Sequence, residues 1–324
     1  MEFQQKINQL REIYCKTISP LITGNYVLLD APYHSNIGDV LIWEGERNFL
    51  STFPYKNLGT HSFISWYRKP LRHDVIILLQ GGGSFGDLYR CFQDFRLGVI
   101  SDYPDNKIIM LPQSVWYKDE SLIEKDAAIM AKHKNLTLCA RDRWSYDFMQ
   151  RHFPANKILL VPDSAFCISD TLLDYDRHRE VPGRKLYFER GDSELGNILP
   201  AGMAIDMEVH EWPTYEQPYN VFNRFWWIDR VQGGLWRFGA LKPIVSPVLD
   251  YYADRHIRRW SVKLGCEFLS PYEYITTTRL HVLILSVLLH KPVDFIDNTT
   301  GKLSAYVDTW LSDLDEVKPF ELTK

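Results

Sequence analysis

Short apolar runs alternate with helical patterns along the first half of the chain. The runs are rich in Ile, Leu and Val, as expected for strands that are covered on both faces. They fall at Tyr26–Asp30, Val75–Gln80, Lys107–Pro112, Leu136–Ala140 and Ile158–Val161. Helical patterns lie between them at Val40–Phe53, Asp87–Tyr103, Ser121–Lys134 and Arg143–Phe153. This alternation predicts an α/β domain with a doubly wound parallel sheet.

A second α/β unit follows a break in this pattern. Residues 170–184 are charged and contain a Pro182-Gly183 turn, so we place a boundary there that divides the chain into domains 1–175 and 176–324. Beyond it we predict strands at Lys185–Glu189, Met203–Met207, Lys242–Val245 and Val293–Ile296, with a short segment at Glu267–Leu269. Predicted helices occupy Tyr219–Leu235, Asp250–Leu264, Leu280–His290 and Leu303–Leu314, the last one placed to pack back on the first domain. The order predicts two Rossmann-like domains facing a cleft.

Composition and charge narrow the class of protein. The 37 basic and 41 acidic residues give a net charge of −4. This net charge gives no reason to expect that the protein binds nucleic acid. The five cysteines are scattered without the spacing of a zinc site, so we expect reduced thiols in the cytoplasm and no metal. The longest apolar stretch, Val282–Leu289, is far below the ~18–20 residues of a membrane span. Residues 1–18 predict an amphipathic helix.

Ligands of open parallel sheets bind beyond the carboxyl ends of the strands, so the loops there are the candidate site. After the first strand come Asn36 and Asp39, which either cap the next helix or face a ligand. After the second comes Gln80–Asp87, whose Gly82, Gly83 and Ser84 let backbone N–H groups approach an anion or a sugar. The alternative is a tight strand-to-helix turn. The spacing also matches a dinucleotide fingerprint, but the following strand ends in Pro112-Gln113 rather than an acidic residue, which disfavours a nicotinamide or flavin cofactor.

Three further loops carry cations. Arg141 and Arg143 follow the fourth strand, Arg190 follows the first strand of the second domain, and Arg279 precedes His281. Guanidinium groups bind carboxylate or phosphate through two hydrogen bonds, and imidazole exchanges protons near neutral pH. The plainer alternatives are a surface ion-pair network and a core histidine.

Aromatic residues gather with arginines in 222–238, around Trp226-Trp227. Such a run is typical of sugar stacking, of a helix at a membrane interface, or of an aromatic-rich core helix.

Taken in order, these loops resemble the polysaccharide pyruvyl transferase family. The matching residues are Asn36-Ile37-Gly38-Asp39, Gly81-Gly82-Gly83 with Asp87, Arg141-Asp142 with Ser145, Asp163-Ser164-Ala165-Phe166, Arg190 with Asp192 and Glu194, and Thr278-Arg279-Leu280-His281. The likeness spans roughly residues 25 to 312, and Val282 departs from it where relatives often have glycine. It implies a fold similar to GT-B glycosyltransferases and transfer of pyruvyl from phosphoenolpyruvate onto two hydroxyls of a sugar, forming a cyclic ketal.

The resemblance also implies roles for the loop residues. His281 is the predicted general acid, and Asp39 or Asp87 accepts a proton from the attacking hydroxyl. The second domain is predicted to bind the donor anion, and the first domain is predicted to bind the acceptor. The predicted donor-binding residues are Arg279, Arg141, Arg190, Arg143 as a substitute for Arg141, and Leu280. The predicted acceptor-binding residues are Asn36, Gly82, Gly83 and Ser84.

The implied partners are phosphoenolpyruvate as co-substrate, with no further cofactor, and a sugar of a surface polysaccharide or its lipid-linked precursor. The N-terminal helix and Trp226-Trp227 would hold the enzyme at the inner face of a membrane. Two other classes stay open: a GT-B-type glycosyltransferase that uses a nucleotide sugar, and a glycan-binding protein without activity. The sequence gives no prediction of oligomeric state.

Overall fold

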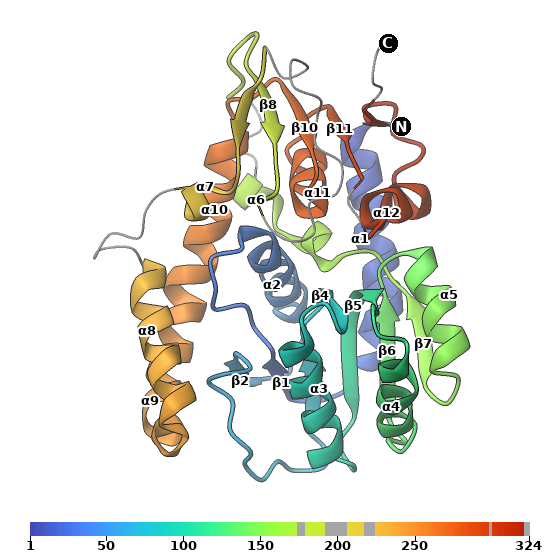
Figure 1. Cartoon of the computed structure of the whole chain (residues 1–324), viewed down its shortest axis with the longest axis vertical. Helices are drawn as coiled ribbons and strands as arrows, with labels where there is room; N and C mark the ends of the chain where they lie inside the picture. Colours follow the sequence, from blue (N-terminus) through green and yellow to red (C-terminus); the bar gives the residue numbers. More distant parts are fainter. Residues whose placement is uncertain (174–178, 192–205, 217–223, 298–299, 321–324) are drawn as a thin grey trace.

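Two parallel β-sheets, one above the other in Figure 1, form the body of this computed structural model. The structure describes residues 1–173, 179–191, 206–216, 224–297 and 300–320. The matching positions 192 and 194 of the resemblance lie outside these residues. Helices cover both sheets, so the predicted Rossmann-like α/β class is confirmed.

The first sheet holds all five strands predicted in the first half of the chain. Its strands are β1 (Tyr26–Leu29), β2 (Asn57–His61), β3 (Ile76–Leu79), β4 (Gly82–Gly86), β5 (Ile108–Trp116), β6 (Leu136–Ala140) and β7 (Lys157–Leu160). They run in the order β2-β1-β3-β5-β6-β7, with β4 beside β5. The helices between them are α2 (Ile37–Leu50), α3 (Arg90–Asp102), α4 (Ser121–Met130) and α5 (Arg143–His152). Strands β2 and β4 were not predicted, because one is a polar edge strand and the other is mostly glycine.

The second sheet differs more from the prediction. It contains β8 (Lys185–Phe188), β9 (Glu208–His210), β10 (Tyr274–Thr277), β11 (Val293–Phe295) and β12 (Val317–Pro319), in the order β12-β11-β10-β8-β9. The strands predicted at 185–189 and 293–296 are confirmed. The one at 203–207 is wrong in its described part, because the strand begins only at Glu208, and residues 203–205 lie outside the described residues. Strands β10 and β12 were not predicted.

The remaining helices precede β1, lie between the two sheets along the chain, or lie between strands of the second sheet. They are α1 (Phe3–Ile18), η1 (Ser19–Leu21), η2 (Ser164–Cys167), α6 (Asp170–Leu173), α7 (Pro213–Glu216), α8 (Arg224–Arg237), η3 (Gly239–Leu241), α9 (Lys242–Tyr252), the π-helical η4 (Ala253–Ile257), α10 (Arg258–Leu269), α11 (Leu280–Leu288) and α12 (Lys302–Trp310). The strand predicted at Lys242–Val245 is wrong, because these residues start α9. The segment Glu267–Leu269 is the end of α10, and residues 219–223 of the helix predicted at 219–235 lie outside the described residues.

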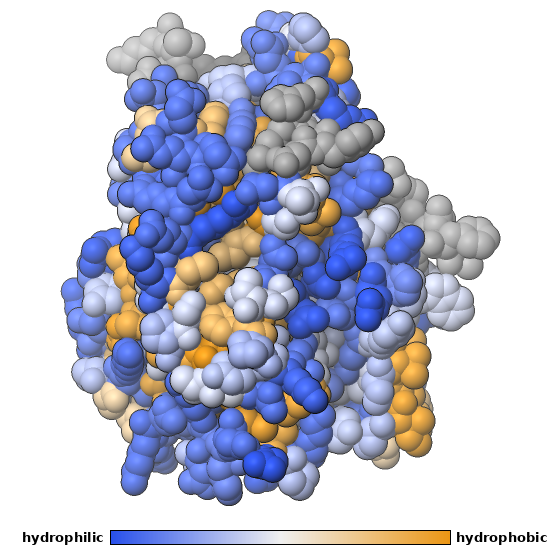
Figure 2. Space-filling view, turned by 180° about the vertical axis from the view of Figure 1, so that it is seen from behind, coloured by the Kyte–Doolittle hydropathy of each residue, from blue (hydrophilic) through white to orange (hydrophobic). Residues whose placement is uncertain are grey.

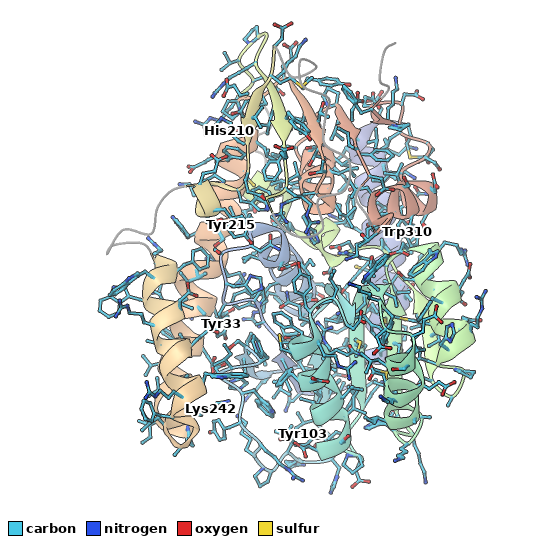
Figure 3. All side chains as sticks on the ribbon, viewed as in Figure 1. Tyr33, Tyr103, His210, Tyr215, Lys242 and Trp310 are labelled. Carbon is cyan, nitrogen blue, oxygen red and sulfur yellow. The ribbon has the colours of Figure 1, made fainter. Side chains whose placement is uncertain are left out.

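Elements from the two ends of the chain pack on each other. Helix α10 lies against α2, α9 against β2, α1 against α11, and α12 against α5. Trp310 at the end of α12 donates from Nε1 to the carbonyl of Arg141 at 2.6 Å (Figure 3). Buried residues of both sheets join one continuous apolar core. The predicted boundary at 175/176 falls between the two sheets along the chain, and the division into two domains stays a prediction.

The N-terminal helix has its apolar face inside the protein. Ile7, Leu10, Tyr14 and Ile18 of α1 are fully buried in the shared core, and Lys6 pairs with Asp313 at 2.6 Å near the other end of the chain. The predicted membrane contact through this helix is therefore wrong, because its apolar residues already contact protein.

Candidate active site

A cavity of about 500 Å³ lies at the carboxyl ends of strands from both sheets. The loops after β1, β2, β3 and β6 line it from the first sheet, and those after β8 and β10 line it from the second. This is the place where open parallel sheets bind ligands, and the volume suits a small substrate with part of a sugar.

The glycine segment at the cavity is a strand rather than the tight turn considered above. Strand β3 continues through Gln80-Gly81 into β4, and both pair with the long strand β5. A Cβ on Gly81 would lie 2.7 Å from the carbonyl oxygen of Pro112, so only glycine allows this pairing. Gly82 and Gly83 line the cavity, and a Cβ on Gly83 would come 3.1 Å from Arg141 Nη2. The glycines thus let cationic side chains approach the backbone.

His281, Asp163 and Arg141 form a buried cluster at one wall. His281 lies in the first turn of α11, with its Nε2 3.5 Å from Asp163 Oδ2 and 3.3 Å from Arg141 Nη1. Arg141 Nη1 donates to the same Asp163 oxygen at 2.9 Å, while its Nε donates to Ser114 Oγ at 2.8 Å. The backbone N–H of Asp163 donates to Tyr306 Oη, so α12 also holds this carboxylate in place. Asp163 is well placed to orient the imidazole.

The environment keeps Asp163 ionised. Burial alone raises the pKa of its carboxyl, but the hydrogen bond and charge of His281 and the charge of Arg141 outweigh burial and lower the pKa from 3.8 to about 2.

This pKa shift predicts an acid-sensitive part of the stability. Because the folded-state pKa of Asp163 lies below its unfolded value, its contribution of about 2 kcal/mol is complete above about pH 4 and is lost as the pH falls toward 2. Urea unfolding of wild type and Asp163→Asn between pH 2 and 6 measures the difference. The two free energies of unfolding should converge at acid pH. A difference that does not change with pH would contradict the assignment.

Two further arginines face the cavity from the second sheet. Arg279 precedes α11, and its Nε and Nη2 donate to the two carboxylate oxygens of Glu211 at 2.8 and 2.5 Å. Its guanidinium carbon is 5.7 Å from the ring centre of Tyr215, labelled in Figure 3. Arg190 also lines the cavity, and its backbone N–H donates to Thr278 Oγ1. Leu280 lines the wall between Arg279 and His281. The fork to Glu211 fixes the Arg279 guanidinium at the cavity wall.

A lysine adds a cation that the sequence did not indicate. Lys302, the first residue of α12, is buried, lines the cavity, and donates from Nζ to the carbonyl of Gly83 at 3.2 Å. A lysine at the start of a helix carries no signal that separates it from a solvent-exposed one. Its position follows from the packing of α12 across the cavity.

The loop after β1 supplies further polar groups to the cavity. Asn36 caps α2 by accepting from the N–H of Gly38, and its Nδ2 donates to Asp39 Oδ2 at 2.8 Å. Asp39 also lies 3.6 Å from His34 Nε2. Both predicted residues line the cavity. The cap is confirmed for Asn36, and its role in ligand binding stays a prediction.

A buried ion pair lies beside Ser84. Arg96 donates from Nε to Asp30 Oδ2 and from Nη2 to Ser84 Oγ, each at 2.8 Å. Burial raises the pKa of Asp30 to about 6, because it outweighs the opposing charge of Arg96. All three residues line the cavity, and Asp30 has a φ of 71° at the end of β1. Asp30 and Arg96 were not among the predicted site residues, although Asp30 ends a predicted strand.

Two predicted site residues lie outside the cavity. The carboxylate of Asp87 accepts from the backbone N–H groups of Lys118 and Asp119 at 2.8 and 2.7 Å, so it fixes the turn after β5. Arg143 is exposed on α5 with its guanidinium 5.3 Å from the Tyr146 ring centre. Their predicted roles as base and donor ligand are corrected to structural and surface positions. Within the described residues, no three His, Cys, Asp or Glu side chains are placed to hold a metal ion.

Comparison with known proteins shows which class of protein this chain resembles. The family model of polysaccharide pyruvyl transferase matches residues 36–300. "Putative pyruvyl transferase EpsO" of Bacillus subtilis (strain 168) is 30% identical over 96% of this chain and 91% of its own length. "Pyruvyl transferase 1" of Schizosaccharomyces pombe is 29% identical over 88% of this chain and 69% of its own. A solved structure of a functionally uncharacterized Klebsiella pneumoniae protein has the same fold, with a TM-score of 0.60 at 18% identity over 99% of both chains.

The matched residues include strands of both sheets and most of the residues that line the cavity. The matches therefore identify the class of protein as a transferase. The chain belongs to the polysaccharide pyruvyl transferase family.

Proposed function

We propose that the enzyme transfers pyruvyl from phosphoenolpyruvate onto two hydroxyls of a sugar and forms a cyclic ketal. The observation that carries this proposal is the ring of cations, Arg141, Arg190, Arg279 and Lys302, around His281 in one cavity. Phosphoenolpyruvate carries a phosphate and a carboxylate close together, so its binding site needs several fixed cations. Its reaction also needs a proton donor at the same place.

The proposed reaction starts at His281. The imidazolium gives its proton to the methylene carbon of phosphoenolpyruvate, and the neighbouring carbon becomes oxocarbenium-like. A sugar hydroxyl adds to that carbon and loses its proton, phosphate leaves, and a second hydroxyl closes the ketal. Asp163 holds the imidazole of His281 in position for the transfer. The reaction consumes one phosphoenolpyruvate and one diol and releases inorganic phosphate, and the proposal calls for no metal or other cofactor.

The proton of the attacking hydroxyl goes to a carboxylate that lines the cavity. Asp39 is one candidate and Asp30, whose pKa is raised to about 6, is the other. A base with such a pKa is suited to accept a proton near neutral pH. Asp87 is no longer a candidate, because its oxygens bind the backbone of the turn after β5.

The proposed donor and acceptor sides are those that the family resemblance implies. We assign the donor to the wall of Arg279, Arg190 and Arg141, and the acceptor to Asn36, Gly82, Gly83 and Ser84. The proposed acceptor is a sugar of a surface polysaccharide or of its lipid-linked precursor, made in the cytoplasm, and the proposed architecture is two Rossmann-like units similar to GT-B glycosyltransferases. Such an acceptor agrees with the word polysaccharide in the family description.

Calorimetric titration with phosphoenolpyruvate tests the donor assignment. Wild type should bind phosphoenolpyruvate saturably, and Arg279→Ala should weaken binding by about 10- to 100-fold, since one charge-assisted hydrogen bond is worth about 1.5–3 kcal/mol. Arg143→Ala is the matched control, because Arg143 is an exposed arginine outside the cavity, and it should bind like wild type. Saturable binding of uridine or guanosine diphosphate in place of phosphoenolpyruvate would overturn the proposal in favour of a nucleotide-sugar glycosyltransferase.

A further inference from the structure

Helix α9 buries two polar residues beside Leu249, and its outward side is apolar. Ser246 and Asp250 are buried, where Ser246 donates to the carbonyl of Ser65 and Asp250 binds Ser65 Oγ and His61 Nδ1, both at 2.6 Å. The outward positions are spaced at three to four residues along one face. They are Leu241 just before the helix, Ile244, Val248 and Tyr251, between 46% and 73% exposed. This is the reverse of a surface helix in a globular protein.

Helix α8 adds exposed aromatic rings to the same region. Trp227, Trp236 and Phe238 are 56%, 68% and 56% exposed. We call the exposed residues 227, 236, 238, 241, 244, 248 and 251 the α8–α9 surface. Helices α8 and α9 stand side by side at one edge of the molecule (Figure 1), and seen from behind, apolar surface runs down that edge (Figure 2). An exposed apolar face such as that of α9 marks an interaction site.

Positive charge surrounds the α8–α9 surface. Residues 224–260 contain seven basic and three acidic side chains, a net charge of +4 in a chain whose total is −4. Two of the three carboxylates bind inward, Asp250 to His61 and Asp254 to Arg47 and Arg258. Of the seven cations, Arg258 is also buried, where it pairs with Glu44. Exposed arginines instead lie over exposed rings, with Arg237 5.6 Å from the Phe238 ring centre and Arg255 5.7 Å from that of Tyr251.

We propose that the α8–α9 surface binds the face of an anionic lipid bilayer. Apolar side chains enter the boundary between headgroups and acyl chains, tryptophans and tyrosine suit the interface, and each arginine near it gains about 1 kcal/mol from anionic lipid. Among the described residues no helix is long and apolar enough to span a membrane, so the contact is peripheral. A second copy of this chain fits less well, because pairing through this surface would bring two positive regions together.

The surface is continuous with the mouth of the cavity. Asp229 and Gln232 of α8 line the cavity. The ring of Trp236 lies 6.3 Å from that of Phe63, which in turn is 4.7 Å from that of Phe92, and the last two residues also line the cavity. A bound bilayer would therefore lie next to the acceptor wall. This places a lipid-linked acceptor at the cavity, an extension that rests on the proposed function, whereas the membrane binding does not.

Co-sedimentation with vesicles tests the surface without any substrate. The purified chain is mixed with phosphatidylcholine vesicles, with or without one third phosphatidylglycerol, at low and at high salt. Wild type should bind the anionic vesicles at low salt and be released by salt. The double variant Ile244→Glu/Val248→Glu should reduce the partition coefficient at least about tenfold, while Val181→Glu, at an apolar residue exposed elsewhere, should not.

A second variant keeps the test decisive if the first one unfolds. Arg230→Gln/Arg237→Gln changes exposed side chains only and should reduce binding to the anionic vesicles severalfold. The proposal is overturned if wild type does not bind the anionic vesicles, or if neither variant changes the binding. It is also overturned if light scattering shows a dimer that Ile244→Glu/Val248→Glu dissociates, because a second copy then covers the surface. Membrane binding without binding of phosphoenolpyruvate would contradict the proposed function alone.

Discussion

His281→Gln is expected to lower turnover by about 10²- to 10⁴-fold while phosphoenolpyruvate still binds within a few-fold of wild type. Gln keeps a polar side chain of similar reach but gives no proton to carbon. The cations that hold the donor, Arg279, Arg190 and Lys302, are unchanged, so the loss should appear in turnover rather than in binding.

Release of inorganic phosphate from phosphoenolpyruvate with a sugar acceptor, together with calorimetric binding, separates the two quantities. His73→Gln is the control, since its side chain is 79% exposed and lies outside the cavity. Wild-type turnover in His281→Gln would remove the imidazole from the reaction. Equal loss of binding and turnover would make it a donor ligand instead.

The first sheet was predictable because its strands are covered on both faces. Such strands appear in the sequence as unbroken apolar runs, as in Ile76–Leu79. The edge strand β2 carries Asn57 and Thr60 among its five residues, and β4 depends on glycines that fit against β5. Neither gives a local apolar signal, because pairing with a neighbour rather than burial of side chains keeps them extended.

The first four residues of α9, Lys242–Val245, were predicted as a strand because Ile244 and Val245 are consecutive β-branched residues. A run of four residues is too short to show a helical period. The contact that decides this region, Asp250 with His61, joins residues far apart in the sequence.

Some residues of the candidate site could be predicted from the nearby sequence, and others depend on contacts between distant parts of the chain. His281, Arg279, Arg190 and Arg141 follow strands and line the cavity, as the position rule for parallel sheets predicts. Glu211 directly follows β9, so the same rule would have found it had that strand been placed correctly.

Two other errors come from side-chain direction. Asp87 and Arg143 also follow strands closely, but the backbone turns their side chains away from the cavity. Lys302 reaches the site only through the packing of α12, which no local pattern shows.

Gly38→Ala is expected to lower turnover by about 100-fold without removing any functional group. Gly38 lies in the first turn of α2, directly against His281. A Cβ there would lie 2.7 Å from His281 Nδ1 and 2.8 Å from its Cβ, closer than real contacts allow. Helix α11 is buried along nearly its whole length, so it has little room to retreat, and the imidazole must shift away from Asp163 and Arg141. A misplacement of about 1 Å costs on the order of 10²-fold in rate.

Gly233→Ala is the matched control for this variant. Gly233 lies in α8, and a Cβ added there would meet no atom within 4 Å, so alanine should keep full turnover and raise stability by up to about 1 kcal/mol. Turnover of both variants is measured beside thermal unfolding and calorimetric binding of phosphoenolpyruvate. Loss of turnover in Gly38→Ala with donor binding retained follows from a displaced proton donor. Wild-type turnover in Gly38→Ala would show that the contact between α2 and His281 does not set the position of the imidazole, and the assignment of His281 would then rest on the first variant alone.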